Sequence, residues 1–282
     1  MPTLGAHVSA PGGLWRAVEK GESIGAEVIQ FFGASPRSWR VKLPDEEEIN
    51  RYLETLRKSK IQSAYLHAPY LINIASPDER IRRSSVGALA AHLKITELLW
   101  AQGLIFHLGS GKEEISKEEA IYLLVHGMRE ILHTVPGETK LVMENSAGGG
   151  HRIGNTPDDM KSILEKIDSP RIKICFDTAH AYEAGLIEAY TPPLIKKLFD
   201  EWDKLVGMEE IAVIHVNDSK TPFNSHNDRH ENIGEGHIAL DGFKSLAKEK
   251  RLKNKPWVLE VPGFDGDGPD RRSMEVLKSC FS

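Results

Sequence analysis

The chain has few cysteines, no long apolar run and no excess of basic residues. Its only two cysteines, Cys175 and Cys280, exclude a disulfide framework and a zinc site built from paired cysteines. No apolar run approaches the roughly 18 residues of a membrane span, and the N-terminus lacks the features of a signal peptide, so we expect a cytoplasmic protein without membrane contact. A formal charge of −5 argues weakly against a nucleic-acid partner, unless bound cations reverse the charge locally.

The chain does contain an alternation of short apolar runs with longer stretches of helical spacing. The apolar runs cover residues 4–8, 28–32, 64–67, 104–107, 141–144, 172–176, 212–216 and 258–260. Helical spacing covers, among others, residues 45–58, 81–100, 117–133, 157–166 and 192–206. No Pro/Ser-rich linker interrupts the alternation. It therefore predicts one α/β domain over residues 1–282, a (β/α)8 TIM barrel with rim loops at its C-terminal face.

Residues with metal-ligating side chains close or directly follow seven of the apolar runs. They are His7, His67, His107, Glu144, Asp177, His215 and Glu260. In a barrel the C-terminal ends of all strands surround one mouth, so these side chains are expected to converge. A single histidine at a strand end is more often structural, and His7 alone would be interpreted in that way. Convergence of the whole set favours a functional site.

The stretch from residue 211 to 236 gives the strongest local indication of a metal. Its apolar run ends in His215, and the polar loop that follows carries Asp228 and His230 at a spacing of two, which places both side chains on one side of an extended chain. Asp177 and His180 similarly leave the sixth run three residues apart. Imidazole nitrogen and carboxylate oxygen are ligands of first-row metals, so we predict a metal site without thiolates.

The remaining histidines and glycine-rich stretches carry weaker signals. Three histidines in helical stretches are expected to face solvent: His92, His126 and His133. Three in loops are left open: His151, His226 and His237. HLGSGKEE and ENSAGGGHRIG do not match phosphate-binding patterns, and their glycines are expected to let the backbone pass close to a ligand.

The motifs GAHVSAPGGL, HAPYLINIAS, FHLGSG, MENSAGGG, FDTAHAYEAG, HVNDSK, NDRHENIGEGHI and LEVPG occur in this order. Together they resemble the endonuclease IV family of apurinic/apyrimidinic endonucleases over almost the whole chain. The resemblance implies a (β/α)8 barrel with three zinc ions, some of which manganese can replace. The implied ligands are His67, His107 and Glu144 for the first zinc; Glu144, Asp177, His215 and Glu260 for the second; and His180, Asp228 and His230 for the third. It places His7 just outside these ligands.

The same resemblance implies hydrolysis of the phosphodiester bond on the 5′ side of an abasic nucleotide in double-stranded DNA, and trimming of blocked 3′ ends. Glu144 would be catalytic as the bridge between two zincs that share a hydroxide, and no protein nucleophile is required. Four residues match DNA-contacting positions: Arg37, Tyr70, Leu71 and Arg229. The loop before Arg37 departs from the family at Ser35 and Pro36, and the chain also departs at Gly149, so we expect backbone contacts to DNA that differ in detail. We expect a monomer.

Two other functions remain open. A sugar isomerase or epimerase of the xylose-isomerase-like barrels would need only one divalent metal, for which Glu144, Asp177, His215 and Glu260 suffice. That function leaves the other ligand candidates unexplained. A non-catalytic DNA-lesion binding module with structural zincs is disfavoured, because structural sites are normally closed by four protein ligands and often contain cysteine.

Overall fold

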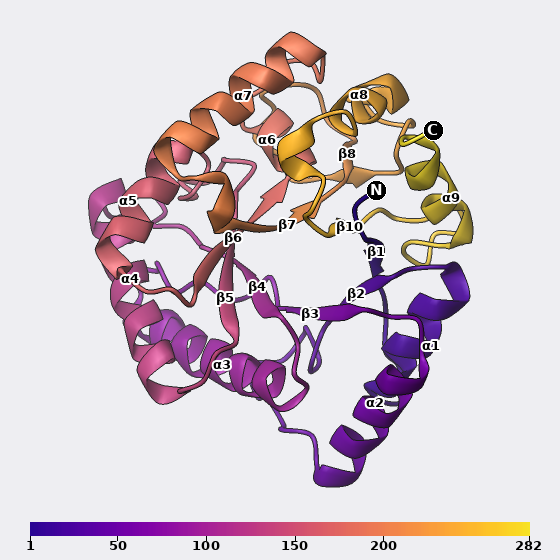
Figure 1. The fold of residues 1–282 in the computed structure, drawn as a ribbon. Coiled ribbons are helices and arrows are strands. Elements are labelled where there is room, and N and C mark those ends of the chain that lie inside the picture. The colour runs from indigo at the N-terminus through magenta and orange to yellow at the C-terminus, as the bar shows by residue number, and fades with distance from the viewer.

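The fold is a closed barrel of eight parallel strands, described for residues 1–282 in a computed structural model (Figure 1). The barrel order is β1-β10-β7-β6-β5-β4-β3-β2. The strands are β1 (Leu4–His7), β2 (Val28–Phe31), β3 (Ser63–His67), β4 (Gly103–His107), β5 (Lys140–Glu144), β6 (Ile172–Asp177), β7 (Ile211–His215) and β10 (Trp257–Leu259). Each expected strand is present with its ends within one residue, so the predicted barrel is confirmed.

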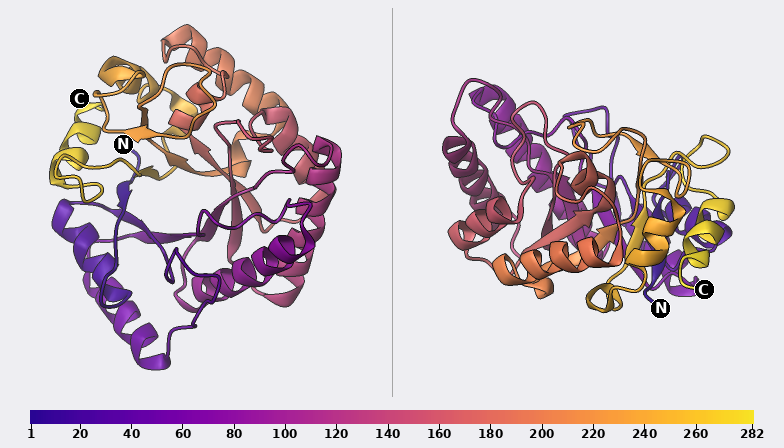
Figure 2. Two further views of the ribbon diagram at one scale, coloured as in Figure 1. Left: turned by 180° about the vertical axis from the view of Figure 1, so that it is seen from behind. Right: turned by 90° about the horizontal axis from the view of Figure 1, so that it is seen from above.

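Helices form a ring around the outside of the barrel, and the two termini lie close together on one side of it (Figures 1 and 2). The helices are α1 (Trp15–Ile24), α2 (Glu46–Lys58), α3 (Glu79–Leu98), α4 (Lys117–Thr134), α5 (Pro157–Ile167), α6 (Thr178–Glu183), α7 (Pro192–Leu205), α8 (Ala239–Leu246) and α9 (Arg271–Ser279), with 3₁₀ turns η1 (Met208–Glu210) and η2 (Lys250–Leu252). A short antiparallel pair, β8 (Asp218–Ser219) and β9 (His230–Glu231), lies outside the barrel. No helix is both long and apolar enough to cross a membrane.

Local sequence signals explain where α2 and α4 begin. The Asp45 side chain accepts a hydrogen bond from the Glu48 amide at the start of α2, and Ser116 forms a capping box with Glu119 at the start of α4. These caps satisfy amide groups that have no partner within the first helical turn. These two helices therefore begin at polar residues whose side chains cap them.

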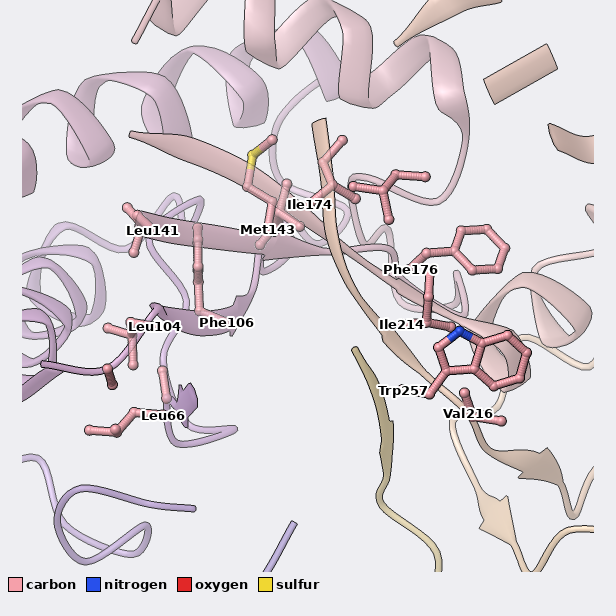
Figure 3. Packing of buried hydrophobic residues seen from close by; sticks show 14 of the residues in the cluster. Leu66, Leu104, Phe106, Leu141, Met143, Ile174, Phe176, Ile214, Val216 and Trp257 are labelled. Carbon is pink, nitrogen blue, oxygen red and sulfur yellow. The ribbon is translucent and has the colours of Figure 1, made fainter. Parts of the chain in front are cut away.

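Alternation along each strand divides the barrel residues between two environments. Outward-facing residues such as Leu66, Phe106 and Phe176 pack against the helices (Figure 3). Inward-facing residues form a separate buried layer with one member from each of seven strands: Val28, Tyr65, Ile105, Val142, Cys175, Val213 and Val258. Because strand side chains alternate between faces, the residue two positions further along each strand also faces the barrel interior. This second layer contains the candidate site.

His92 corrects one prediction from the sequence. We expected it to face solvent, but it is fully buried in α3, and neither ring nitrogen has a hydrogen-bond partner. The buried residues Leu89, Leu93 and Thr96 lie three, one and four positions away, so His92 belongs to the face of α3 that packs inward. His126 and His133 are exposed as expected.

Candidate metal centre

The mouth of the barrel gathers one polar side chain from the end of each strand. Seven are the strand-end residues singled out in the sequence, and the eighth is Gln30 on β2. Register brings neighbouring strands to the same height, since His107 pairs with Glu144 and Asp177 pairs with His215. The mouth opens into a cavity of about 410 Å³, whose lining includes His67, Tyr70, His107, His230 and Glu260. The expected convergence is therefore what the barrel produces.

Glu144 lies at the centre of this constellation and is almost fully buried. Its Oε2 is 3.0 Å from His67 Nε2 and 3.1 Å from His107 Nε2. Its Oε1 is 3.0 Å from His215 Nδ1. The two carboxylate oxygens thus face different imidazoles, which is the arrangement that a carboxylate bridging two cations requires.

A second group of donors forms around His215. Its Nδ1 lies 3.1 Å from Glu260 Oε2 and 3.8 Å from Asp177 Oδ2. The donor atoms of Glu144, Asp177, His215 and Glu260 all lie within 4.8 Å of one another. His7 lies at the edge of this group, with Nδ1 3.2 Å from Glu260 Oε1.

A third group depends on α6 and on the loop between β8 and β9. Asp228 Oδ1 lies 3.3 Å from His180 Nε2 and 3.7 Å from His230 Nε2. The antiparallel pairing of β8 with β9 returns the loop to the mouth and places His230 beside Asp177, at 3.7 Å between Nε2 and Oδ2. Glu183 also lies within reach of His180 and Asp228. The structure thus brings the three residues of the predicted third set together, with additional carboxylates nearby.

The donor set fits divalent metals. His180 Nε2 and His230 Nε2 are buried without hydrogen-bond partners. Four carboxylates, those of Glu144, Asp177, Asp228 and Glu260, converge in the mouth, and Arg152 is the only Arg or Lys that pairs with any of them, 3.5 Å from Asp228 Oδ2. Nitrogen and oxygen donors without thiolate are suited to zinc and manganese.

Neighbouring histidines keep the carboxylates of Glu144 and Glu260 ionised, which is the form that binds cations. Burial alone would raise the pKa of Glu144, but His107 and His215 hold it well below its usual value. Burial likewise opposes ionisation of Glu260, and His215 lowers its pKa well below normal. Cys175 lies one layer below, where burial raises its pKa to about 12, so the thiol stays protonated and is a poor ligand.

Two asparagines, which the sequence analysis did not single out, orient the ligand candidates. Asn217 donates from Nδ2 to Asp177 Oδ2 at 2.6 Å and accepts from the Glu260 amide at 2.7 Å. Asn145 accepts from the Asp177 amide at 2.6 Å. Each asparagine follows a strand-end ligand candidate by one or two residues, and this position was the available signal.

The residues expected to contact DNA lie on the rim with different exposure. Arg37 is exposed, and Tyr70 is 73% exposed beside the cavity. Arg229 is exposed, and its Nη1 donates to the Asp228 carbonyl at 2.7 Å. Leu71 is half-buried against the hydrophobic core, so it presents only part of its side chain. The sequence does not decide the role of three loop histidines, and all three are exposed: His151, His226 and His237.

Comparisons with known proteins show which family this chain resembles. The family model described as a xylose isomerase-like TIM barrel matches residues 18–280. A probable endonuclease 4 from Halothermothrix orenii is 34% identical over 280 residues, covering 98% of this chain and 99% of the relative. Endonuclease IV from Thermus thermophilus superposes with a TM-score of 0.86 at 30% identity, covering 99% of this chain and 98% of that one.

A D-tagatose 3-epimerase-like protein also superposes, with a TM-score of 0.72 at 21% identity, covering 99% of this chain and 96% of that one. This second likeness is one of fold alone. The matches to the endonucleases extend over nearly the whole of both chains at 30% identity or more. The chain therefore belongs to the endonuclease IV family of the xylose isomerase-like TIM barrels.

Proposed function

We propose that the protein is an apurinic/apyrimidinic endonuclease that acts as a monomer in the cytoplasm. It hydrolyses the phosphodiester bond on the 5′ side of an abasic nucleotide in double-stranded DNA, leaves a 3′ hydroxyl and a 5′ deoxyribose phosphate, and also removes blocked 3′ ends. The observation that carries the proposal is the set of three donor groups that meet in one barrel mouth, in a member of the endonuclease IV family.

Three zinc ions per chain would occupy these groups. The first would be held by His67, His107 and Glu144, the second by Glu144, Asp177, His215 and Glu260, and the third by His180, Asp228 and His230. Bound zinc lowers the pKa of coordinated water to about 7 and withdraws charge from phosphate oxygens. Three such ions add +6 to the formal charge of −5 and place it at the mouth, which accounts for DNA binding by an acidic chain.

The chain's own residues would select and hold the DNA. Arg37 and Arg229 are exposed cations on the rim, where they can neutralise phosphates on either side of the lesion. Tyr70 projects beside the cavity and offers an aromatic face to the disrupted base stack. Turning a nucleotide that has already lost its base out of the duplex costs less than unpairing an intact one, which favours abasic sites.

Cleavage of a labelled duplex that contains one abasic site tests the proposal. We expect a nick on the 5′ side of the lesion, about three zinc ions per chain by elemental analysis, and no cleavage of the same duplex without the lesion. Glu144→Gln keeps the side-chain shape but loses the bridging charge, and should reduce nicking on the order of 100-fold or more, beyond what loss of an orienting residue costs. Glu165→Gln, on the exposed face of α5, is the matched control and should nick normally.

A one-metal sugar epimerase is the second candidate, because Glu144, Asp177, His215 and Glu260 form a donor group by themselves. It predicts a single manganese or magnesium ion, interconversion of ketoses and an intact duplex. A lesion-binding module predicts retention of the abasic duplex without cleavage. Either result in the duplex assay would replace the proposed function.

A further inference from the structure

We propose that Gln30 is a positioning residue that fixes the tautomer of His215 and thereby directs the Nδ1 lone pair of His215 to the second metal. The inference deepens the proposed function and rests on its metal centre. No ligand role is suggested for Gln30 itself. Its position, its hydrogen bonds and the contrast with the other histidines support the assignment.

Gln30 occupies the same inward-facing layer as the metal-ligand candidates. Val28, two residues earlier on β2, belongs to the apolar layer beneath, and strand alternation therefore turns Gln30 into the mouth. The residue pairs with His7 on β1 and with Tyr65 on β3 in the strand register, and is completely buried. A primary amide without solvent must find its hydrogen-bond partners inside the protein.

The partners that Gln30 finds are ligand candidates. Gln30 Oε1 lies 2.7 Å from His215 Nε2, and Gln30 Nε2 donates to Glu260 Oε1. The same amide nitrogen lies 2.8 Å from His7 Nδ1. One side chain therefore contacts two of the four members of the second donor group, and contacts His7 as well.

His215 differs from the other ligand histidines in which ring nitrogen faces the site. His67, His180 and His230 each turn Nδ1 toward a backbone carbonyl, at 2.7, 2.8 and 3.3 Å respectively, and their Nε2 atoms face the donor groups. His180 Nδ1 lies farther from Glu144 Oε1, at 3.4 Å, than from its carbonyl. His215 is reversed, since its Nδ1 faces Glu144 and Glu260. Its outer nitrogen meets Gln30 and not a backbone carbonyl, so this tautomer depends on a side chain.

The chemistry follows from the amide. An amide oxygen accepts hydrogen bonds but cannot donate them, so His215 Nε2 must carry the proton. In the neutral ring Nδ1 then has the free lone pair that metal coordination requires. Donation from Gln30 to Glu260 orients a second ligand toward the same ion. Outer partners of this kind typically account for 10- to 100-fold in metal affinity.

Gln30→Met tests the assignment, because methionine has a similar length but neither accepts nor donates as an amide does. Zinc binding to metal-free protein is measured by competition with a chromogenic chelator, and the imidazole nitrogens of ¹⁵N-histidine-labelled, zinc-loaded protein are followed by NMR. We expect one of three zinc ions to bind about 10- to 100-fold more weakly. We also expect one imidazole to lose its slowly exchanging Nε2 proton. Gln102→Met, at an exposed glutamine, should change neither quantity.

Gln30→Glu separates positioning from packing and remains informative if the methionine variant folds poorly. A carboxylate still accepts from His215 Nε2 but cannot donate to Glu260, so the Nε2 proton signal should persist while zinc binding weakens. The proposal is overturned if Gln30→Met binds zinc within twofold of wild type with unchanged imidazole signals, or if Gln30→Glu loses the Nε2 proton. Wild-type protein that binds zinc without nicking DNA overturns only the proposed function, and wild-type protein without zinc overturns both.

Discussion

His92→Leu should make the protein more resistant to acid, because His92 is a buried histidine that the fold cannot protonate. Both ring nitrogens are buried without partners, and burial lowers the pKa of His92 to about 4, with a smaller contribution from His67. In the unfolded chain the pKa returns to about 6.5. Above pH 6.5 both states are neutral at this residue. As the pH falls from 6.5 toward 4, the unfolded chain takes up a proton that the folded chain does not, so folding stability is lost.

The magnitude follows from the difference in proton affinity. Each tenfold change is worth about 1.4 kcal/mol, so a pKa lowered from 6.5 to about 4 corresponds to about 3 kcal/mol of stability that wild type loses between pH 7 and pH 4 through this group. A second effect is independent of pH. Leucine fills a similar volume and removes two unsatisfied nitrogens, which should stabilise the variant at pH 7 by about 1 to 3 kcal/mol.

Urea unfolding followed by far-UV circular dichroism at pH 7, 5.5 and 4 measures both effects. Subtracting the variant from wild type cancels the titrating groups that do not interact with His92, because these are common to both proteins, and leaves only the small coupling to His67. The difference should widen by about 3 kcal/mol toward pH 4. His126→Leu, at an exposed position on α4, is the control and should show no such widening. A difference that stays constant with pH would show that His92 is protonated or partnered in the folded protein, and would refute the reasoning.

Two further predictions concern the loop that carries Asp228 and the rim. Glu183 is fully buried and accepts hydrogen bonds from Ser219 Oγ at 2.6 Å and from the Arg229 amide at 3.3 Å. Because Glu183→Ala removes both contacts, it should lower zinc content toward two ions per chain and speed proteolysis between residues 219 and 229. Unchanged cleavage by protease would contradict this prediction. Tyr70 is 73% exposed beside the cavity and is not a ligand candidate, so Tyr70→Ala should weaken binding of an abasic duplex by about 1 to 3 kcal/mol in a fluorescence-anisotropy titration, with zinc content unaltered. Equal affinity for wild type and variant would remove Tyr70 from the DNA surface.

The parts of the fold and site that were predictable are those governed by local periodicity. Each strand of the barrel is a short apolar run, and a ligand candidate such as Glu144 at the end of such a run must lie at the mouth. Gln30 obeys the same geometry but is enclosed by apolar neighbours in VIQFF, so nothing in the local pattern distinguished it from a core position. The prediction for His92 is wrong because membership of a helix does not by itself imply exposure, and its spacing from Leu89 and Thr96 places it on the buried face of α3.

The third donor group could not be derived from periodicity, because it depends on how a loop returns. His180 lies on α6, directly after β6, whereas Asp228 follows ten residues after Asp218 in a segment without regular spacing. The distance between His180 and Asp228 depends on the two-residue pairing of β8 with β9 and on the buried Glu183 carboxylate, which accepts a hydrogen bond from the Arg229 amide. The contact from Glu183 to the Arg229 amide joins residues 46 positions apart, and no local pattern encodes it.

The same loop separates the two functions that this barrel could support. Glu144, Asp177, His215 and Glu260 all come from barrel strands or their immediate ends, and a one-metal epimerase would need no more. Of the additional donors, His67 and His107 end β3 and β4, whereas His180, Asp228 and His230 come from α6 and from the β8–β9 segment, which Asp218 holds in place. That buried carboxylate accepts from the amides of Gly234 at 2.9 Å, Gly236 at 3.2 Å and Ile238 at 2.8 Å. Each amide lies beyond β9, so Asp218 anchors the chain on the far side of His230, while Glu183 anchors it on the near side. A loop held on both sides of His230 fixes the positions of Asp228 and His230. A one-metal site does not need these two donors, whereas a third cation beside the other two would.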